Sequence, residues 1–253
     1  MNIYEITFSP AGGTQKVLDI VAGSISAERT NIDLTDRDVD FDGFHFKEDD
    51  ICIIAVPSYG GRVPDVAVSR LKSMNGGGAA AVLITVYGNR DYEDTLLELK
   101  DGLDEAGFHC TAAVAAVAKH SIMPKIAADR PDEEDEELLK SFAGKIKEHL
   151  SAETSSDELY VPGHRPYREY NGVPLKPKAG KACTKCGICT EKCPVGAIPE
   201  DPKKTDKDKC ISCMRCVNVC PNNARSLNKL VLGIASKKME KMCSERKKDE
   251  LFI

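Results

Sequence analysis

The sequence predicts an α/β domain followed by a small cysteine-rich domain, and three observations support this division. Apolar, β-rich runs alternate with helical patterns through the first 150 residues, which is typical of a parallel sheet covered by helices. Eight of the eleven cysteines lie in the 38 residues from Cys183 to Cys220. Residues 1–150 hold 15 Lys and Arg against 27 Asp and Glu, a net charge of −12, whereas residues 151–253 have a net charge of +7.

The first 150 residues contain five expected strands and four expected helices. The strands are expected at 2–8, 30–35, 51–56, 79–87 and 109–118, and the helices at 14–27, 64–74, 91–106 and 132–150. Two of the strands, ICIIAV and AAAVLITV, are nearly continuous apolar runs, which is typical of central strands buried on both faces. The acidic run at 132–137 falls in the first turns of the last helix, where negative charge complements the helix dipole.

The rest of the chain divides by composition. Pro, Gly, Ser and Tyr accumulate from Ser151 to Gly180, and within this stretch we expect a domain over 1–152 to end and a linker to run over 153–178. The cysteine-rich domain is expected over 179–228. Residues 229–253 are expected to form a basic helix that ends in a frayed terminus.

Composition also restricts the class of protein. No apolar stretch approaches the roughly 18 residues that a membrane-spanning helix needs, so we expect no membrane span. The first ten residues, MNIYEITFSP, show neither a basic region nor an apolar region of a secretory leader. A cytoplasmic location is therefore expected, where clustered thiols indicate metal ligands rather than disulfides.

The cysteines form an internal duplication. The segment CTKCGICTEKCPVGA at 183–197 recurs as CISCMRCVNVCPNNA at 210–224, displaced by 27 residues. Each copy has the spacing C-x2-C-x2-C-x3-C-P, which is the run associated with 4Fe-4S clusters. Two zinc sites are the alternative, because zinc also binds four thiolates, although zinc modules usually offer two separate C-x2-C pairs.

Residues 179–228 closely resemble the bacterial two-cluster ferredoxins. The resemblance implies a small α+β fold with pseudo-twofold symmetry, in which each cluster carries one electron. In this type of run the fourth cysteine ligates the other cluster. One cluster would then be held by Cys183, Cys186, Cys189 and Cys220, and the other by Cys210, Cys213, Cys216 and Cys193.

A glycine-containing loop follows the first expected strand and leads into a helix. It consists of Ser9, Pro10, Ala11, Gly12, Gly13 and Thr14. Backbone N–H groups at such a helix start, together with hydroxyls, can bind an anion. The loop lacks the Gly-Lys-Ser/Thr ending of a Walker loop and the G-x-G-x-x-G of a dinucleotide site, and a bare strand-to-helix turn is the alternative.

Two aromatic loops are expected at the same edge of the sheet. One follows the third strand and contains Pro57, Ser58, Tyr59, Gly60 and Gly61. The other follows the fourth strand and contains Tyr87, Gly88, Asn89 and Tyr92. Open α/β sheets bind ligands at this carboxyl edge, tyrosine offers a flat face to a ring system, and glycine permits close approach of backbone amides.

Together the three loops resemble those of the flavodoxins, whose cofactor is FMN. The resemblance covers residues 1–150 and implies a five-stranded parallel sheet of order 2-1-3-4-5. It implies that the phosphate would be held by Ser9, Gly12, Gly13 and Thr14, the isoalloxazine flanked by Tyr59 and Tyr87, and its edge contacted by Gly60, Gly88 and Asn89. The family has a hydroxyl residue at the position of Ala11, so one phosphate hydrogen bond is lost here, which would weaken FMN binding by about 0.5–1.5 kcal/mol.

Other polar residues carry weaker signals. His120 follows the fifth strand and could face the flavin edge, although a lone histidine in a loop is more often simply solvated. Cys52 and Cys110 fall within expected strands and are interpreted as small buried hydrophobic residues. Cys243, in the basic tail, is interpreted as an ordinary thiol.

The whole chain is similar to flavodoxin–ferredoxin fusion proteins of anaerobic bacteria. The resemblance implies low-potential electron transfer between FMN and two 4Fe-4S clusters and onward to redox partner proteins, with no nucleic-acid partner. The alternative is an FMN-dependent reductase of a small molecule that is fed by its own clusters. No catalytic acid or nicotinamide module is identifiable, so the electron carrier is preferred and no catalytic residue is assigned. The donor and acceptor are not readable from the sequence.

Overall fold

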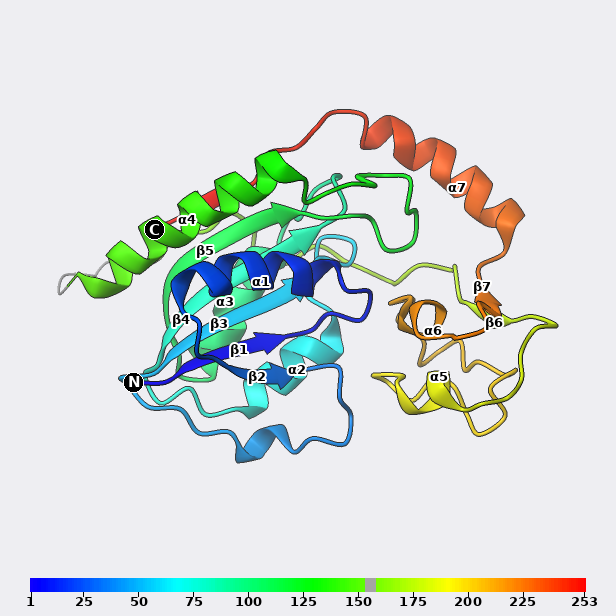
Figure 1. The fold of residues 1–253 in the computed structure, drawn as a ribbon, viewed down its shortest axis with the longest axis horizontal. Helices are drawn as coiled ribbons and strands as arrows, with labels where there is room; N and C mark the ends of the chain where they lie inside the picture. The colour runs from blue at the N-terminus through cyan, green and yellow to red at the C-terminus, as the bar shows by residue number, and fades with distance from the viewer. Residues whose placement is uncertain (153–157) are drawn as a thin grey trace.

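A computed structural model describes residues 1–152 and 158–253. Within these ranges the chain forms a layered α/β unit, a cysteine-rich segment beside it, and one further helix (Figure 1). The first five residues of the expected linker, 153–157, lie outside the described residues. The remaining part, from residue 158 to residue 177, runs along the α/β unit without regular secondary structure.

The main sheet has six strands in the order β2-β1-β3-β4-β5-β8. The first five are parallel, which confirms the expected fold class and strand order. The sixth is antiparallel to β5. The strands are β1 (Ile3–Thr7), β2 (Thr30–Asp33), β3 (Ile51–Pro57), β4 (Ala80–Tyr87), β5 (His109–Val117) and β8 (Glu250–Phe252).

The strand β8 shows that the expectation of a frayed terminus was wrong. Leu251 and Phe252 pack against the hydrophobic clusters on opposite faces of the sheet. The carboxylate of Asp249 accepts the backbone N–H of Val117 at 2.8 Å. A strand of three residues gives a very weak pattern in the sequence, and its pairing is decided by contacts with β5, more than a hundred residues earlier.

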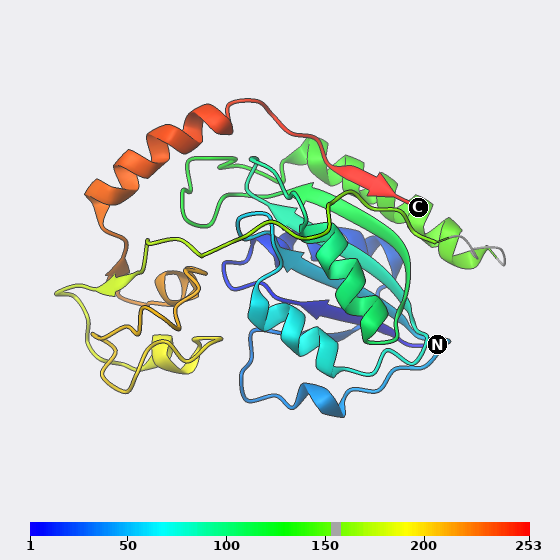
Figure 2. The same ribbon diagram turned by 180° about the vertical axis from the view of Figure 1, so that it is seen from behind.

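Helices cover both faces of the sheet (Figures 1 and 2). Helices α1 and α4 bury their apolar sides on one face, and α2 and α3 bury theirs on the other. This arrangement follows from the amphipathic patterns, which place an apolar stripe on each helix. The helices of this unit are α1 (Gly13–Ile25), α2 (Asp65–Ser73), α3 (Thr95–Glu105) and α4 (Glu133–Ser151), with a short 3-10 turn η1 (Phe41–Gly43).

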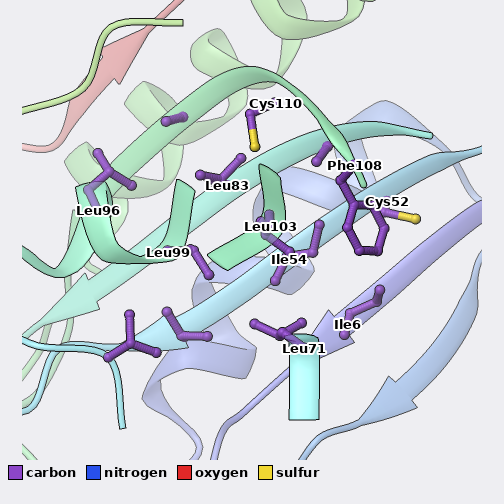
Figure 3. Close-up of a cluster of buried hydrophobic side chains, with 14 of the residues drawn as sticks. Ile6, Cys52, Ile54, Leu71, Leu83, Leu96, Leu99, Leu103, Phe108 and Cys110 are labelled. Carbon is purple, nitrogen blue, oxygen red and sulfur yellow. The ribbon is translucent and has the colours of Figure 1, made fainter. Parts of the chain in front are cut away.

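Figure 3 shows the core between the sheet and the helices α2 and α3. Side chains such as Ile54 and Leu83 from the strands meet Leu71 and Leu103 from the helices, and all four are fully buried. Cys52 and Cys110 also lie in this core, which confirms their interpretation as buried hydrophobic residues. Burial raises the pKa of both thiols.

The helix expected from residue 91 begins instead at Thr95. Asn89 and Glu93 have positive φ angles of 63° and 44°, which an α-helix does not accommodate. The chain therefore makes an irregular loop between β4 and α3. The backbone N–H groups of His164 and Arg168 donate to the Asp94 carboxylate, at 2.9 and 2.7 Å, so this loop also anchors the segment that leads to the cysteines.

The cysteine-rich segment lies beside the edge where the strands of the main sheet end (Figure 1). It contains a two-stranded antiparallel sheet of β6 (Lys178–Ala179) and β7 (Arg225–Ser226), and the short helices α5 (Ile188–Glu191) and α6 (Arg215–Asn218). This is the small α+β unit expected from the repeat. Helix α7 (Lys229–Met242) then leads the chain back to β8.

Within residues 1–152 and 158–253, no helix combines the length and apolar character required to span a bilayer.

Candidate functional site

Four loops at the carboxyl edge of the main sheet line a cavity of about 70 Å³, called here the loop cavity. They follow β1, β3, β4 and β5. Eight of the residues expected at this site line it: Ala11, Gly13, Thr14, Pro57, Ser58, Tyr59, Tyr87 and Gly88.

The loop after β1 leaves the start of α1 open to a ligand. Gly12 has φ +89°, which is the left-handed region that glycine tolerates. The N-cap residue, Gly12, has no side chain to offer to the first turn of this helix. The hydroxyl of Ser9 accepts the backbone N–H of Gln15, in that first turn, at 2.8 Å, and lies outside the cavity lining. The N–H groups of Gly13 and Thr14, ahead of Gln15, therefore suit an anion such as a phosphate.

The two expected aromatic residues have different surroundings. Tyr59 is half-buried, and burial raises the pKa of its phenol well above the ordinary value, helped by the nearby Cys213 and Tyr170. Tyr87 is only 5% exposed, and its ring centroid lies 5.2 Å from that of Tyr92. Tyr59 is thus available to a ligand in the loop cavity, whereas Tyr87 is mainly a core side chain with one side on the cavity.

Gly60 and Gly61 lie outside the cavity lining. A Cβ atom on Gly60 would come within 2.3 Å of the Tyr170 ring, and one on Gly61 would overlap the Glu93 side chain. Both glycines have positive φ angles. They therefore permit the segment around Tyr170 to pack closely on the loop after β3, a contact with no signal in the sequence.

Asn89 and Tyr92 also point away from the cavity, toward the C-terminal segment. The Asn89 amide donates to the carbonyl oxygens of Cys243 and Glu245, both at 2.9 Å, and its oxygen accepts the N–H of Lys247 at 3.0 Å. The Tyr92 hydroxyl donates to the Glu250 carboxylate at 2.7 Å. Both side chains hold the C-terminal segment against the sheet. Contrary to expectation, neither of them lines the loop cavity.

His120 belongs to the loop cavity, so the preferred interpretation of a simply solvated side chain was wrong. Its ring packs so closely on Gly88 that a Cβ atom added to this glycine would lie 2.7 Å from the ring. Its Nδ1 accepts the backbone N–H groups of Ile122 and Met123, each at 3.2 Å. Burial, together with the positive charge of Arg90, lowers the pKa of His120. The sequence held one indication of this placement, because His120 follows β5 and therefore lies at the same edge of the sheet as the other loops.

The eight clustered cysteines line two separate cavities of similar size. One is lined by the set called here the inner tetrad: Cys193, Cys210, Cys213 and Cys216. The other is lined by the outer tetrad: Cys183, Cys186, Cys189 and Cys220. Each set joins three cysteines of one repeat to the fourth of the other, as the resemblance implied.

The thiols are set in contrasting environments. Burial raises the pKa of Cys213 to about 12, and the neighbouring thiols of its tetrad add to the effect. Burial acts in the same direction on Cys220, but three backbone N–H groups and the guanidinium of Arg225 outweigh it and lower the pKa of that thiol. Four thiolates around a cavity repel one another, so they need bound cations to remain charged together.

The cavities fit a cluster of several atoms. In the ranges 1–152 and 158–253, no three His, Cys, Asp or Glu side chains converge closely enough to hold a single metal ion. Instead, four thiols line each of the two cavities, which is the donor set of a 4Fe-4S cluster. The backbone N–H groups of Ala197 and Ala224 donate to the sulfurs of Cys193 and Cys220, at 3.3 and 3.2 Å, which is the hydrogen bonding that cluster ligands receive.

The inner tetrad lies on the side that faces the main sheet. Arg70 donates to the carbonyl oxygen of Pro194 at 2.9 Å, and Asn218 to that of Ala11 at 3.4 Å. A third, open cavity of about 730 Å³, called here the connecting cavity, runs between the loop after β1 and α6. Met214 lines both this cavity and that of the inner tetrad, and Gly13 lines both this cavity and the loop cavity. Sequence spacing could not have revealed this adjacency.

The comparisons with known proteins bear first on the cysteine repeat. Two family models, each described as "4Fe-4S binding domain", match residues 183–197 and 203–226. These matches confirm the prediction of two 4Fe-4S segments. They cover the repeat and not the sheet-forming part of the chain.

Curated relatives match the same region. The chain is 49% identical over 45 residues to "Pyruvate synthase subunit PorD" of Methanocaldococcus jannaschii, covering 17% of this chain and 52% of the relative. It is 50% identical over 42 residues to "Ferredoxin" of Alicyclobacillus acidocaldarius subsp. acidocaldarius, covering 16% and 54%. The chain thus spans about half the length of the curated relatives it matches.

A solved structure resembles the first part of the chain. It is a short-chain flavodoxin associated with a non-canonical PDU bacterial microcompartment, with a TM-score of 0.44 and 20% identity. The similarity covers 60% of this chain and 100% of that structure.

Proposed function

We propose that the protein is a low-potential electron carrier that passes electrons between FMN in the loop cavity and two 4Fe-4S clusters, and on to a redox partner protein. The observation that carries this proposal is the continuity of the cavities. The loop cavity, the connecting cavity and the inner tetrad share lining residues in that order, through Gly13 and Met214. Two chemically different redox sites are therefore adjacent in one chain.

The residues around the loop cavity fit FMN. The start of α1 at Gly12 and Gly13 presents backbone N–H groups to a phosphate, and the ring of Tyr59 offers a flat face to the flavin. His120 presents a neutral ring at the same cavity. Bound FMN supplies two-electron capacity that is used in single steps. The acidic first 150 residues, with a net charge of −12, disfavour added negative charge on a bound flavin.

The inner and outer tetrads fit two clusters, each of which exchanges one electron. The eight cysteines are the proposed ligands, with Cys193 and Cys220 each crossing to the tetrad of the other repeat. We propose the unit boundaries 1–152, 153–178, 179–228 and 229–253, with β8 returning to complete the first unit. The cysteine-rich unit is then fastened to the FMN unit at both of its ends.

A second candidate function is favoured by the size of the connecting cavity. At about 730 Å³ it offers space beside the loop cavity, and Lys16, Lys119 and Arg130 contribute to its lining. A small anionic substrate could enter there and be reduced at FMN with electrons from the clusters. Turnover of such an acceptor by the purified protein would favour this reductase over the carrier.

The experiment that tests the proposal is a cofactor analysis of protein purified without oxygen. We expect about eight iron, eight sulfide and one FMN per chain, from two cubane clusters and one flavin site. Colorimetric iron and sulfide assays and flavin fluorescence after denaturation give these values. Zinc in place of iron would reject the clusters, and the absence of bound flavin from protein supplied with FMN would reject the flavin site.

A further inference from the structure

A buried arginine lies between the two tetrads. Arg225, the first residue of β7, is only 2% exposed. Its guanidinium donates to the sulfur of Cys189 at 3.7 Å and to the carbonyl oxygens of Pro202 and Pro177 at 2.6 and 3.2 Å. It also donates to the hydroxyl of Thr205 at 2.7 Å. Its Nε has no hydrogen-bond partner among the described residues.

The charge of Arg225 is not balanced by a carboxylate. All four of its hydrogen-bond acceptors are formally neutral groups when the thiols are protonated. In the described ranges, the ion pairs of this segment are formed by other cations: Lys185 with Asp201, Lys192 with Glu191, and Arg215 with Asp33. A guanidinium stays charged in proteins, and a buried charge without a counter-ion is strongly unfavourable. An anionic group therefore has to complete this site.

The guanidinium contacts the lining of both tetrad cavities. Arg225 lines the cavity of the outer tetrad and is hydrogen-bonded to Cys189 of that set. Two of its other acceptors, the carbonyl oxygen of Pro177 and the hydroxyl of Thr205, belong to residues that line the cavity of the inner tetrad. An iron–sulfur cube with four thiolates carries negative charge, and one-electron reduction adds one more.

We propose that Arg225 is the counter-charge shared by the two clusters and that it raises the reduction potential of both. This inference rests on the proposed function, because it requires clusters in both tetrads. A fixed positive charge favours the more negative, reduced form of each cluster, and burial prevents water from screening it. A single side chain then shifts both potentials in the same direction.

The test is an anaerobic redox titration of the holoprotein, with dithionite as reductant, followed by electron paramagnetic resonance. Arg225→Met and Arg225→Gln should each lower the reduction equilibrium constant of both clusters by at least about tenfold, which is about 59 mV for one electron. Arg225→Lys keeps the charge and should retain most of the wild-type potential. Lys185→Met is the matched control, because Lys185 lies in the cysteine repeat but is 58% exposed and paired with Asp201. Its potentials should remain close to wild type.

Two results would overturn the inference. Equal potentials in Arg225→Lys and Arg225→Gln would show that the charge has no role, and a change confined to one cluster would show that it is not shared. Iron analysis of each variant separates these results from loss of the clusters. If the wild-type protein itself lacked iron, the proposed function would fail, and this inference with it.

A measurement on the unaltered protein keeps the inference testable if the neutral variants do not assemble. Protein labelled with ¹⁵N in its arginine side chains can be reduced with dithionite and examined by pulsed electron paramagnetic resonance. We expect a ¹⁵N coupling to the reduced clusters that Arg225→Lys removes. A wild-type spectrum without such a coupling would contradict the contact on which the inference depends.

Discussion

Cys193 belongs to the first cysteine repeat by sequence, yet in space it lines the cavity of the inner tetrad with three cysteines of the second repeat. At the residue scale this exchange makes a direct prediction. Cys193→Ser should alter the same cluster as Cys213→Ser, while Cys189→Ser should alter the other. Iron content and electron paramagnetic resonance of the reduced variants measure this. A spectrum of Cys193→Ser that matched Cys189→Ser would show that the tetrads are wrongly assigned.

Asp249 carries a pH-dependent prediction at the same scale. Burial raises its pKa from 3.8 to about 6, so the folded chain keeps a proton that the unfolded chain has released. This group therefore stabilises the fold at low pH, and its contribution is lost as the pH rises from about 4 to about 6. Asp249→Asn can still accept the N–H of Val117 but does not ionise.

Between pH 5 and pH 7.5 the free energy of unfolding of Asp249→Asn should fall less than that of wild type, by on the order of 1 kcal/mol. Urea unfolding at several pH values measures the difference. Asp38→Asn, at a side chain that is 81% exposed, is the control and should follow wild type. Parallel pH profiles for Asp249→Asn and wild type would contradict the shifted pKa.

At the scale of elements, β8 closes the edge of the sheet that β5 would otherwise expose. Deleting residues 250–253 removes the backbone pairing with β5, the partner of the Tyr92 hydroxyl, and the half-buried Leu251 and Phe252. We expect the free energy of unfolding to fall by on the order of 2–4 kcal/mol. Deleting only Ile253, which is 57% exposed, should change it little. Chemical denaturation of both truncated proteins measures these free energies. Equal free energies of unfolding for the two truncated proteins would mean that β8 adds nothing to the stability of the sheet.

At the scale of the whole molecule, the charge is divided between the two halves of the chain. An acidic sheet-forming part lies beside a basic cysteine-rich part, so encounters with a redox partner should be steered by charge. We expect NADPH alone to reduce the protein slowly, because no nicotinamide fingerprint is present, and a low-potential protein donor to reduce it rapidly. Raising the ionic strength should slow the reaction with the protein donor.

Stopped-flow absorbance of the flavin and clusters, with each donor at two ionic strengths, measures these rates. Rapid reduction by NADPH that is insensitive to salt, with turnover of a small acceptor, would favour the reductase over the carrier.

Local sequence patterns were enough to predict several features of the fold and of the site. The alternation of apolar runs and amphipathic helices predicted the five parallel strands and their helices, because a strand or helix shows its buried face within a few turns of chain. The spacing of the cysteine repeat predicted the two tetrads, since three ligands of each lie within seven residues. The loops after β1, β3 and β4 were found because parallel strands bring their carboxyl ends to one edge.

Contacts between single side chains from distant parts of the chain could not be predicted and became visible in the folded structure. Asn89 was expected at the cofactor, but its amide holds residues 243–247. His120 was expected in solvent, but it lines the loop cavity. Arg225 gave no signal in the sequence, although it is buried between the tetrads. A side chain's role in such contacts depends on the packing of distant segments, which leaves no periodic pattern around the residue itself.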